Sequence, residues 1–246
     1  MLLAVNIGNT NISFAFFKAQ KIKTCWDIPL RDYSKSRLAK RLTVNKISAA
    51  LICSVVPGLS SELIADIYNL SGIKPQLIGR SIRVPIKTRY DQSQLGYDRL
   101  VNAYAASRIY KVPAIIISCG TAITIDAVSK DKVHLGGLIM PGLKLSLAAL
   151  NLGTAQLPKL ELKQSCGLLG KSTKSSILNG VILGASAAAS ALIKKIKLKI
   201  GTKTEVIGTG GDINKMSKFS PEIKIIDSKI TLKGIALIYE DTKRIS

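Results

Sequence analysis

The start of the chain constrains the fold most, because two apolar runs flank a short polar segment there. Residues 2–5 and 12–17 are apolar in large part, and Asn6 to Asn11 separate them. This pattern predicts two strands joined by a tight turn. Gly8 permits a positive φ, and the residues after it place backbone amides and short polar groups at the tip, where an anion can bind. An ordinary surface hairpin is the alternative reading.

A second segment repeats this pattern in the middle of the 246-residue chain. Residues 114–126 run from an apolar strand through Ser118, Cys119, Gly120 and Thr121 into a second strand rich in β-branched residues. Two similar hairpins predict two topologically similar α/β lobes, residues 1–113 and 114–246, each offering a turn to a cleft between them. This arrangement suits a nucleoside triphosphate held from two sides.

Further elements fit an α/β chain. Apolar and polar patterning predicts strands near 22–28, 49–56 and from 206 into a glycine-rich turn, and helices near 33–42, 60–70, 143–150 and onward from 173. Residues 175–193 carry no charge, but their alanine, glycine, serine and asparagine content gives a weak drive into a membrane, so a buried helix is expected. No signal peptide is expected, because Asn6 interrupts the first apolar run.

Composition excludes several classes of function. The net charge of +21 is spread over both halves and attracts anionic substrates, but only 5% of residues are aromatic, so specific nucleic-acid binding is not expected. Four cysteines without a CxxC pair indicate reduced thiols in the cytoplasm. His134 is the only histidine, which excludes His-rich zinc sites and leaves a structural role for it.

The segment from Tyr90 to Ala106 holds the strongest candidate for acid–base chemistry. A helix beginning near Asp98 places this carboxylate and Arg99 in its first turn, where a negative charge is stabilised, and Gly96 allows a close approach. The pair can act as a helix cap and surface ion pair. Beside a phosphate site, it can instead act as a proton acceptor and an anion clamp.

The order of the short motifs along the chain resembles that of the type III pantothenate kinases, in the superfamily of actin, sugar kinases and heat-shock ATPases. The resemblance spans nearly the whole chain. It rests on Gly8-Asn9-Thr10, Cys53-Ser54-Val55-Val56-Pro57, Gly96-x-Asp98-Arg99, Gly120-Thr121-Ala122-x-Thr124-x-Asp126, Gly136-Gly137-x-Ile139-x-Pro141-Gly142, Leu157-Pro158, Gly170-x-x-Thr173 and Gly208-Thr209-Gly210-Gly211.

The resemblance implies two actin-like (ribonuclease H-like) lobes and transfer of the γ-phosphoryl group of ATP to pantothenate, the first step towards coenzyme A. It implies a cytoplasmic homodimer that uses Mg²⁺ and K⁺ or NH₄⁺ and does not bind a membrane. Asp98 matches the general base. The residues matching the ATP site are Asn6, Ile7, Gly8, Asn9, Thr10, Asn11, Ile12, Ser13 and Thr121, and those matching the pantothenate site are Tyr90, Gly96, Tyr97, Asp98, Arg99 and Thr173.

Two positions depart from the family's pattern. The family has Asp where this chain has Asn6, and it has a cation-positioning Asp where this chain has Ser118. Both replacements keep a neutral oxygen but lose a negative charge that hard cations prefer. The leading hypothesis is therefore a pantothenate kinase with altered cation dependence. The alternatives are a catalytically impaired relative that binds nucleotide or pantothenate as a regulator or partner subunit, and a basic nucleic-acid-binding protein.

Overall fold

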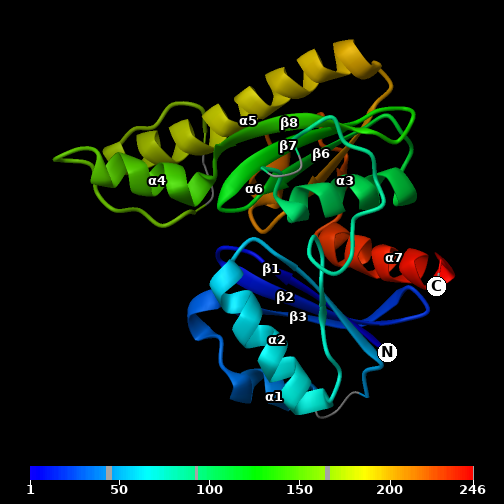
Figure 1. Cartoon of the computed structure of the whole chain (residues 1–246). Coiled ribbons are helices and arrows are strands. Elements are labelled where there is room, and N and C mark those ends of the chain that lie inside the picture. The colour runs from blue at the N-terminus through cyan, green and yellow to red at the C-terminus, as the bar shows by residue number, and fades with distance from the viewer. Residues whose placement is uncertain (43–45, 92–93, 164–166, 246) are drawn as a thin grey trace. The chain divides into compact units, whose positions relative to one another are not determined.

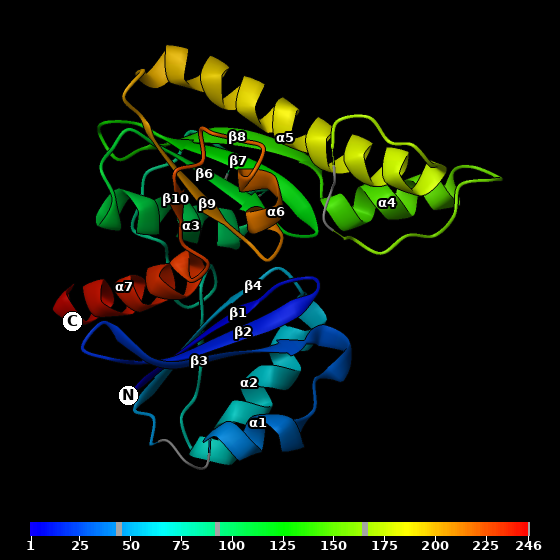
Figure 2. The same ribbon diagram turned by 180° about the vertical axis from the view of Figure 1, so that it is seen from behind.

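The computed structural model describes residues 1–42, 46–91, 94–163 and 167–245. The chain forms two compact α/β units. The first comprises residues 1–86, 91–105 and 229–246, and the second comprises residues 87–90 and 106–228. Each unit is built on one five-stranded sheet, as Figures 1 and 2 show from opposite sides.

The sheet of the first unit has the strand order β3-β2-β1-β4-β5. The strands are β1 (Leu2–Ile7), β2 (Asn11–Lys18), β3 (Lys21–Pro29), β4 (Ala49–Ser54) and β5 (Gln76–Leu77). The first three are antiparallel neighbours, whereas β4 and β5 continue in parallel. The predicted first hairpin is therefore present, and its turn lies beside the carboxyl end of β4.

Helices cover both faces of this sheet. α1 (Lys35–Leu42) and α2 (Pro57–Ser71) bury Leu38 and Leu63 in the core formed by alternate residues of β1 and β2. The other face is covered by α7 (Ile230–Ile245) (Figure 2). α7 in turn packs against α3 (Tyr97–Ile109). α3 and α7 are joined by a hydrogen bond from Thr231 to Asn102, 2.7 Å long, and by one from Tyr104 to Asp241.

The sheet of the second unit repeats the first. Its order is β10-β9-β6-β7-β8, in which three antiparallel strands are again followed by two parallel ones. The strands are β6 (Ala114–Cys119), β7 (Ala122–Val128), β8 (His134–Pro141), β9 (Glu205–Thr209) and β10 (Ile225–Ile226). The two similar lobes predicted from the hairpins are confirmed at the level of topology.

Three helices of the second unit are α4 (Leu143–Leu152), α5 (Thr173–Ile200) and α6 (Ile213–Ser217). α5 begins after Ser172, whose side chain caps the helix and forms a reciprocal capping box with Ser175. By length and composition, α5 alone among the described helices is long and apolar enough to cross a membrane. However, Ile182, Ala189 and Ile193 on one side of α5 are fully packed against the sheet, as in a core helix.

Two boundaries differ from those predicted. The first unit includes α7, whereas the sequence predicted that all of residues 114–246 belong to the second lobe. The reason is that Gly234 lets α7 approach Val101 and Ala105 of α3, so closely that a Cβ atom there would lie 2.8 Å from Val101. α2 begins at Pro57 rather than near Ser60, because the fixed φ of proline suits the first position of a helix.

Candidate active site

The first turn exposes the polar residues that were predicted to bind phosphate. The N–H of Gly8 donates to the carbonyl of Asn11 over 3.0 Å and closes the turn. Asn9, Thr10 and Asn11 are exposed at its tip. Glycine at this position permits a positive φ, but Gly8 does not adopt one. A Cβ atom on Gly8 would lie 3.4 Å from the carbonyl oxygen of Asn11, an ordinary contact distance, so neither φ nor packing requires glycine here.

Asn6 lies in a row of three side chains at the end of β1. Its register partners are Ser13 on β2 and Cys53 on β4, so all three side chains point to the same face of the sheet. The Oδ1 atom of Asn6 is buried and has no hydrogen-bond partner among the described residues. A buried, unpaired oxygen is costly, which indicates that a ligand, cation or water satisfies it.

The carboxylate of Asp98 lies close to this row. Burial raises the pKa of the Cys53 thiol well above its ordinary value, and the negative charge of Asp98 raises this pKa further. The backbone N–H of Arg99 donates to Oδ1 of Asp98 over 2.9 Å. A Cβ atom on Gly96 would lie only 2.8 Å from the same oxygen. The carboxylate is therefore held at the start of α3, where its charge is favoured.

Tyr97 and Arg99 flank Asp98 and are firmly placed. The hydroxyl of Tyr97 donates to the carbonyl of Gly79 over 3.3 Å. Gly79 has a φ of +89°, and a Cβ atom on it would overlap the Tyr97 ring. Arg99 is 5% exposed, which makes it a buried cation within the first turn of α3. The first unit thus brings together the predicted ATP turn, Asp98, Gly96, Tyr97 and Arg99.

The second turn lies in the second unit. Thr121 is exposed at its tip, and the N–H of Gly120 donates to the carbonyl of Ala122 over 3.0 Å. Ser118 is in register with Thr124 and Thr209, so three hydroxyl-bearing side chains share one face of the sheet. Where the family has a carboxylate, this chain has a row of neutral oxygens, which are weaker ligands for a hard cation.

Glycines allow two segments to contact the second turn closely. A Cβ atom on Gly142 would lie 2.2 Å from the carbonyl oxygen of Gly120, and one on Gly210 would lie 2.4 Å from that of Cys119. Gly210 has a φ of +91°, a conformation that other residues rarely adopt. The glycine-rich segment that follows β9 therefore touches the second turn.

A charged cluster that was not predicted from the sequence lies beside this turn. Asp212 is 5% exposed, and its two carboxylate oxygens each lie 3.3 Å from a lysine ammonium group, one of Lys144 and one of Lys215. The three residues come from α4, α6 and the segment between β9 and α6, so they are distant in sequence. Asp212 directly follows the glycine-rich segment, which was the only local signal.

Tyr90 and Thr173, the remaining residues predicted for pantothenate, also lie in the second unit. Tyr90 is half-buried, and its ring centroid lies 6.3 Å from that of His134. Thr173 is the exposed first residue of α5. The predicted substrate residues are therefore divided between the two units.

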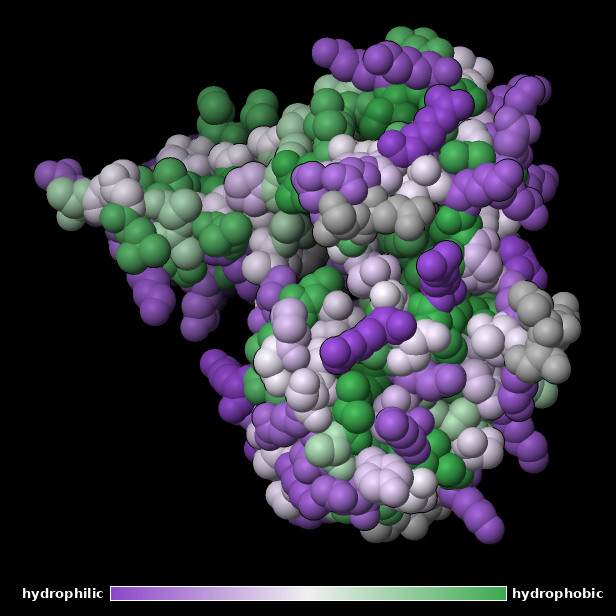
Figure 3. Space-filling model, viewed as in Figure 1, coloured by the Kyte–Doolittle hydropathy of each residue, from purple (hydrophilic) through white to green (hydrophobic). Residues whose placement is uncertain are grey.

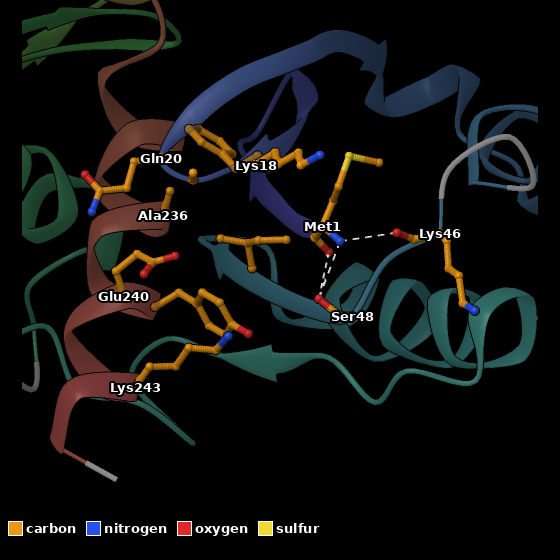
Figure 4. Close-up of a pocket in the computed structure, with 12 residues that line it drawn as sticks. Met1, Lys18, Gln20, Lys46, Ser48, Ala236, Glu240 and Lys243 are labelled. Atoms are coloured by element: carbon orange, nitrogen blue, oxygen red, sulfur yellow. Dashed lines mark hydrogen bonds between the residues drawn. The ribbon is translucent and has the colours of Figure 1, made fainter.

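A hollow of about 460 Å³ lies in the first unit, at the opposite end of β1 from the first turn (Figure 4). Its lining includes Met1 and Leu2 at the beginning of β1 and Tyr239 of α7, whereas the predicted site is at the carboxyl end of β1. The described residues also contain no group of three or more His, Cys, Asp or Glu side chains able to hold a metal ion.

Comparisons with known proteins agree with the fold and the motifs. The sequence model of the type III pantothenate kinase family matches residues 2–195. A type III pantothenate kinase from Finegoldia magna is 36% identical over 99% of this chain and 98% of its own length.

Solved structures with the same fold are more distant in sequence. A structure from Campylobacter jejuni, named as a Baf family transcriptional activator, has a TM-score of 0.65 at 20% identity and covers 98% of this chain and 99% of its own. The activator of 2-hydroxyisocaproyl-CoA dehydratase from Clostridium difficile has a TM-score of 0.56 at 14% identity and covers 100% of this chain and 98% of its own.

The repeated sheet gives the protein the fold of actin-like ATPases and sugar kinases. Within this class, the chain belongs to the type III pantothenate kinase family. It is a kinase that phosphorylates pantothenate with ATP at the start of coenzyme A biosynthesis, and the binding-only alternative is not favoured.

Proposed function

We propose that Asp98 is the general base of this pantothenate kinase. Its carboxylate takes the proton of the primary hydroxyl of pantothenate while the hydroxyl oxygen forms a bond to the γ-phosphorus of ATP. The bond between this phosphorus and the bridging oxygen of ADP breaks, and ADP leaves with the electron pair. Alignment and charge stabilisation account for most of the catalysis in such transfers.

The position of the Asp98 carboxylate carries this proposal. Gly96 and the N–H of Arg99 hold it, and its charge reaches Cys53, which is in register with Asn6 beside the first turn. The closeness of the Asp98 carboxylate to the polar turn within one unit supports the roles of proton acceptor and phosphate-binding turn.

The nucleotide is proposed to contact residues 6–13 and Thr121. Exposed amides and hydroxyls at both turns suit phosphate oxygens. The unpaired Oδ1 of Asn6 fits Mg²⁺ or one of its waters, and Ser118 fits K⁺ or NH₄⁺ with neutral oxygens only. Mg²⁺, when bound, supplies positive charge to the phosphoryl oxygens.

Pantothenate is proposed to contact Tyr90, Gly96, Tyr97, Arg99 and Thr173. The hydroxyl to be phosphorylated must reach Asp98, so the backbone near Gly96 must leave room for it. The substrate also carries a carboxylate, and the guanidinium of Arg99 and the hydroxyls of Tyr90 and Thr173 are suitable partners for its polar groups.

We further propose a cytoplasmic homodimer that binds neither a membrane nor a specific nucleic acid. α5 exposes a row of small residues, and a Cβ atom on Gly180 or Gly184 would meet nothing within 4 Å. Exposed leucines at 145, 152, 168 and 169 lie on α4 and the segment before α5, where Figure 3 shows hydrophobic side chains gathered. A second copy of the chain would cover these surfaces.

A coupled assay of ADP release with pantothenate and Mg-ATP, at several K⁺ concentrations, tests the proposal. Wild-type protein should turn over, and Asp98→Asn should lower kcat by roughly a hundredfold or more, because the amide cannot accept the proton. Gly58→Ala is a matched control, since its Cβ meets nothing. Equal rates for wild type and Asp98→Asn would refute the role of Asp98.

A further inference from the structure

His134 is the only histidine of the chain, and its side chain is completely buried at the start of β8. Nε2 of this imidazole lies 2.9 Å from Oδ1 of Asp126, a carboxylate that is 2% exposed. A buried charge of this kind requires a partner, and His134 supplies one. Asp126 lies on β7, the strand that leads out of the second turn.

The other nitrogen of His134 is linked to Tyr90 through Thr88. Nδ1 lies 2.8 Å from Oγ1 of Thr88, and the same Oγ1 accepts the backbone N–H of Tyr90 over 3.0 Å. One tautomer satisfies every group: Nε2–H donates to Asp126, and the Thr88 hydroxyl donates to Nδ1. The hydroxyl of Thr88 then donates to Nδ1 of His134 and accepts from the N–H of Tyr90.

The backbone reinforces the same connection. The N–H of His134 donates to the carbonyl of Lys87, and the N–H of Arg89 donates to the carbonyl of His134, both over 2.9 Å. Tyr90 follows directly, and its ring lies 3.8 Å from the position that a Cβ atom of Gly136 would take. Thr88 and His134 thereby form an isolated parallel β-bridge, which fastens the segment 87–90 to β8.

We propose that the chain of contacts from Asp126 through His134 and Thr88 positions Tyr90 for pantothenate, so that His134 and Thr88 are positioning residues of the kinase. This inference rests on the proposed contact of Tyr90 with pantothenate. Because Asp126 lies on the strand that begins at the second turn, the contacts also join the substrate residue to the nucleotide-binding hairpin. His134 has a function that its burial alone does not suggest.

A purely structural function for His134 predicts a different result from substitution. Loss of a structural contact lowers the melting temperature and affects both substrates alike. Loss of a positioning contact acts on one substrate and leaves the other unchanged. The KM values for pantothenate and ATP therefore separate the two functions.

Thr88→Val and Thr88→Ser form the matched pair for this test. Valine keeps the shape of threonine but removes the hydroxyl, whereas serine keeps the hydroxyl. We expect Thr88→Val to raise the KM for pantothenate by roughly tenfold, because Tyr90 loses its fixed place, and to change the KM for ATP by less than about twofold. Thr88→Ser should restore the wild-type KM for pantothenate.

Nuclear magnetic resonance gives a second measurement that needs no variant of Thr88. In untagged, ¹⁵N-labelled protein the single histidine gives one set of imidazole signals. We expect these signals to be those of the tautomer that carries its proton on Nε2. Pantothenate should shift these signals in wild type and not in Tyr90→Ala. This measurement decides the question if Thr88→Val does not fold.

Several results would overturn the inference: equal rises of both KM values in Thr88→Val, the same rise in Thr88→Ser, or imidazole signals that pantothenate does not shift. Failure of the underlying proposal looks different. If Tyr90→Ala leaves the KM for pantothenate unchanged while the wild type turns over, Tyr90 is not a substrate residue.

Discussion

Gly96→Ala tests how tightly the carboxylate of Asp98 is held. The added Cβ would lie 2.8 Å from Oδ1, and ordinary contact begins at 3.4 Å, so the oxygen has to retreat by about 0.6 Å. A misplacement of about 1 Å at a reacting group can cost on the order of a hundredfold in rate. We therefore expect kcat to fall by roughly tenfold, with a small loss of stability of about 1 kcal/mol from the poorer helix cap.

The assay is pantothenate-dependent ADP release at saturating Mg-ATP, with thermal unfolding measured in parallel. Gly58→Ala, at the start of α2 in the same unit, serves as the control, because its Cβ meets no atom within 4 Å. It should retain the wild-type kcat. If Gly96→Ala keeps full kcat while Asp98→Asn does not, the reaction needs the carboxylate of Asp98 but does not depend on the contact between residue 96 and Oδ1.

Three further predictions follow from the two turns and their supports. Asn6→Asp with Ser118→Asp should raise kcat by roughly tenfold to a hundredfold through restored cation binding, and an unchanged rate at every K⁺ concentration would contradict this. Gly79→Ala should lower the melting temperature and raise the KM for pantothenate, because the φ of +89° at Gly79 and the Tyr97 ring beside it exclude a Cβ atom. A variant with the melting temperature and the KM of the wild type would refute this packing. Burial first, and then Asp212, raise the pKa of Cys119 from 9.0 to about 12. The thiol's contribution to stability is thus complete below pH 9 and is lost as the pH rises towards 12. Urea unfolding at about pH 8 and about pH 11 measures this effect. Between these pH values the free energy of unfolding should fall less in Cys119→Ala than in the wild type, and equal falls would contradict the raised pKa of Cys119.

Local patterns predicted the parts of the fold that local chemistry determines. The two hairpins followed from apolar runs around short polar segments, and the start of α3 followed from the residues around Asp98. In each case the signal lies within a few residues of the feature it predicts.

Contacts between distant residues could not be predicted in this way. An amphipathic pattern shows that α7 buries one face, but not that it packs on the sheet of the first unit. The same limit applies to Tyr97 on Gly79 and to His134 on Thr88, which are 18 and 46 positions apart. Such contacts depend on how the strands associate, and no local pattern contains that information.

The neutral residues at positions 6 and 118 lie where their neighbours are also uncharged. Asn6 is in register with Ser13 and Cys53, and Ser118 is in register with Thr124 and Thr209. A carboxylate at position 6 would lie near Asp98, and like charges at short distance oppose each other's ionisation unless a cation lies between them. Asparagine at position 6 adds no such charge beside Asp98. If Asp98 is the base, as proposed, a carboxylate at position 6 needs a cation between the two charges, and the rate of Asn6→Asp should therefore depend on Mg²⁺ more steeply than that of the wild type.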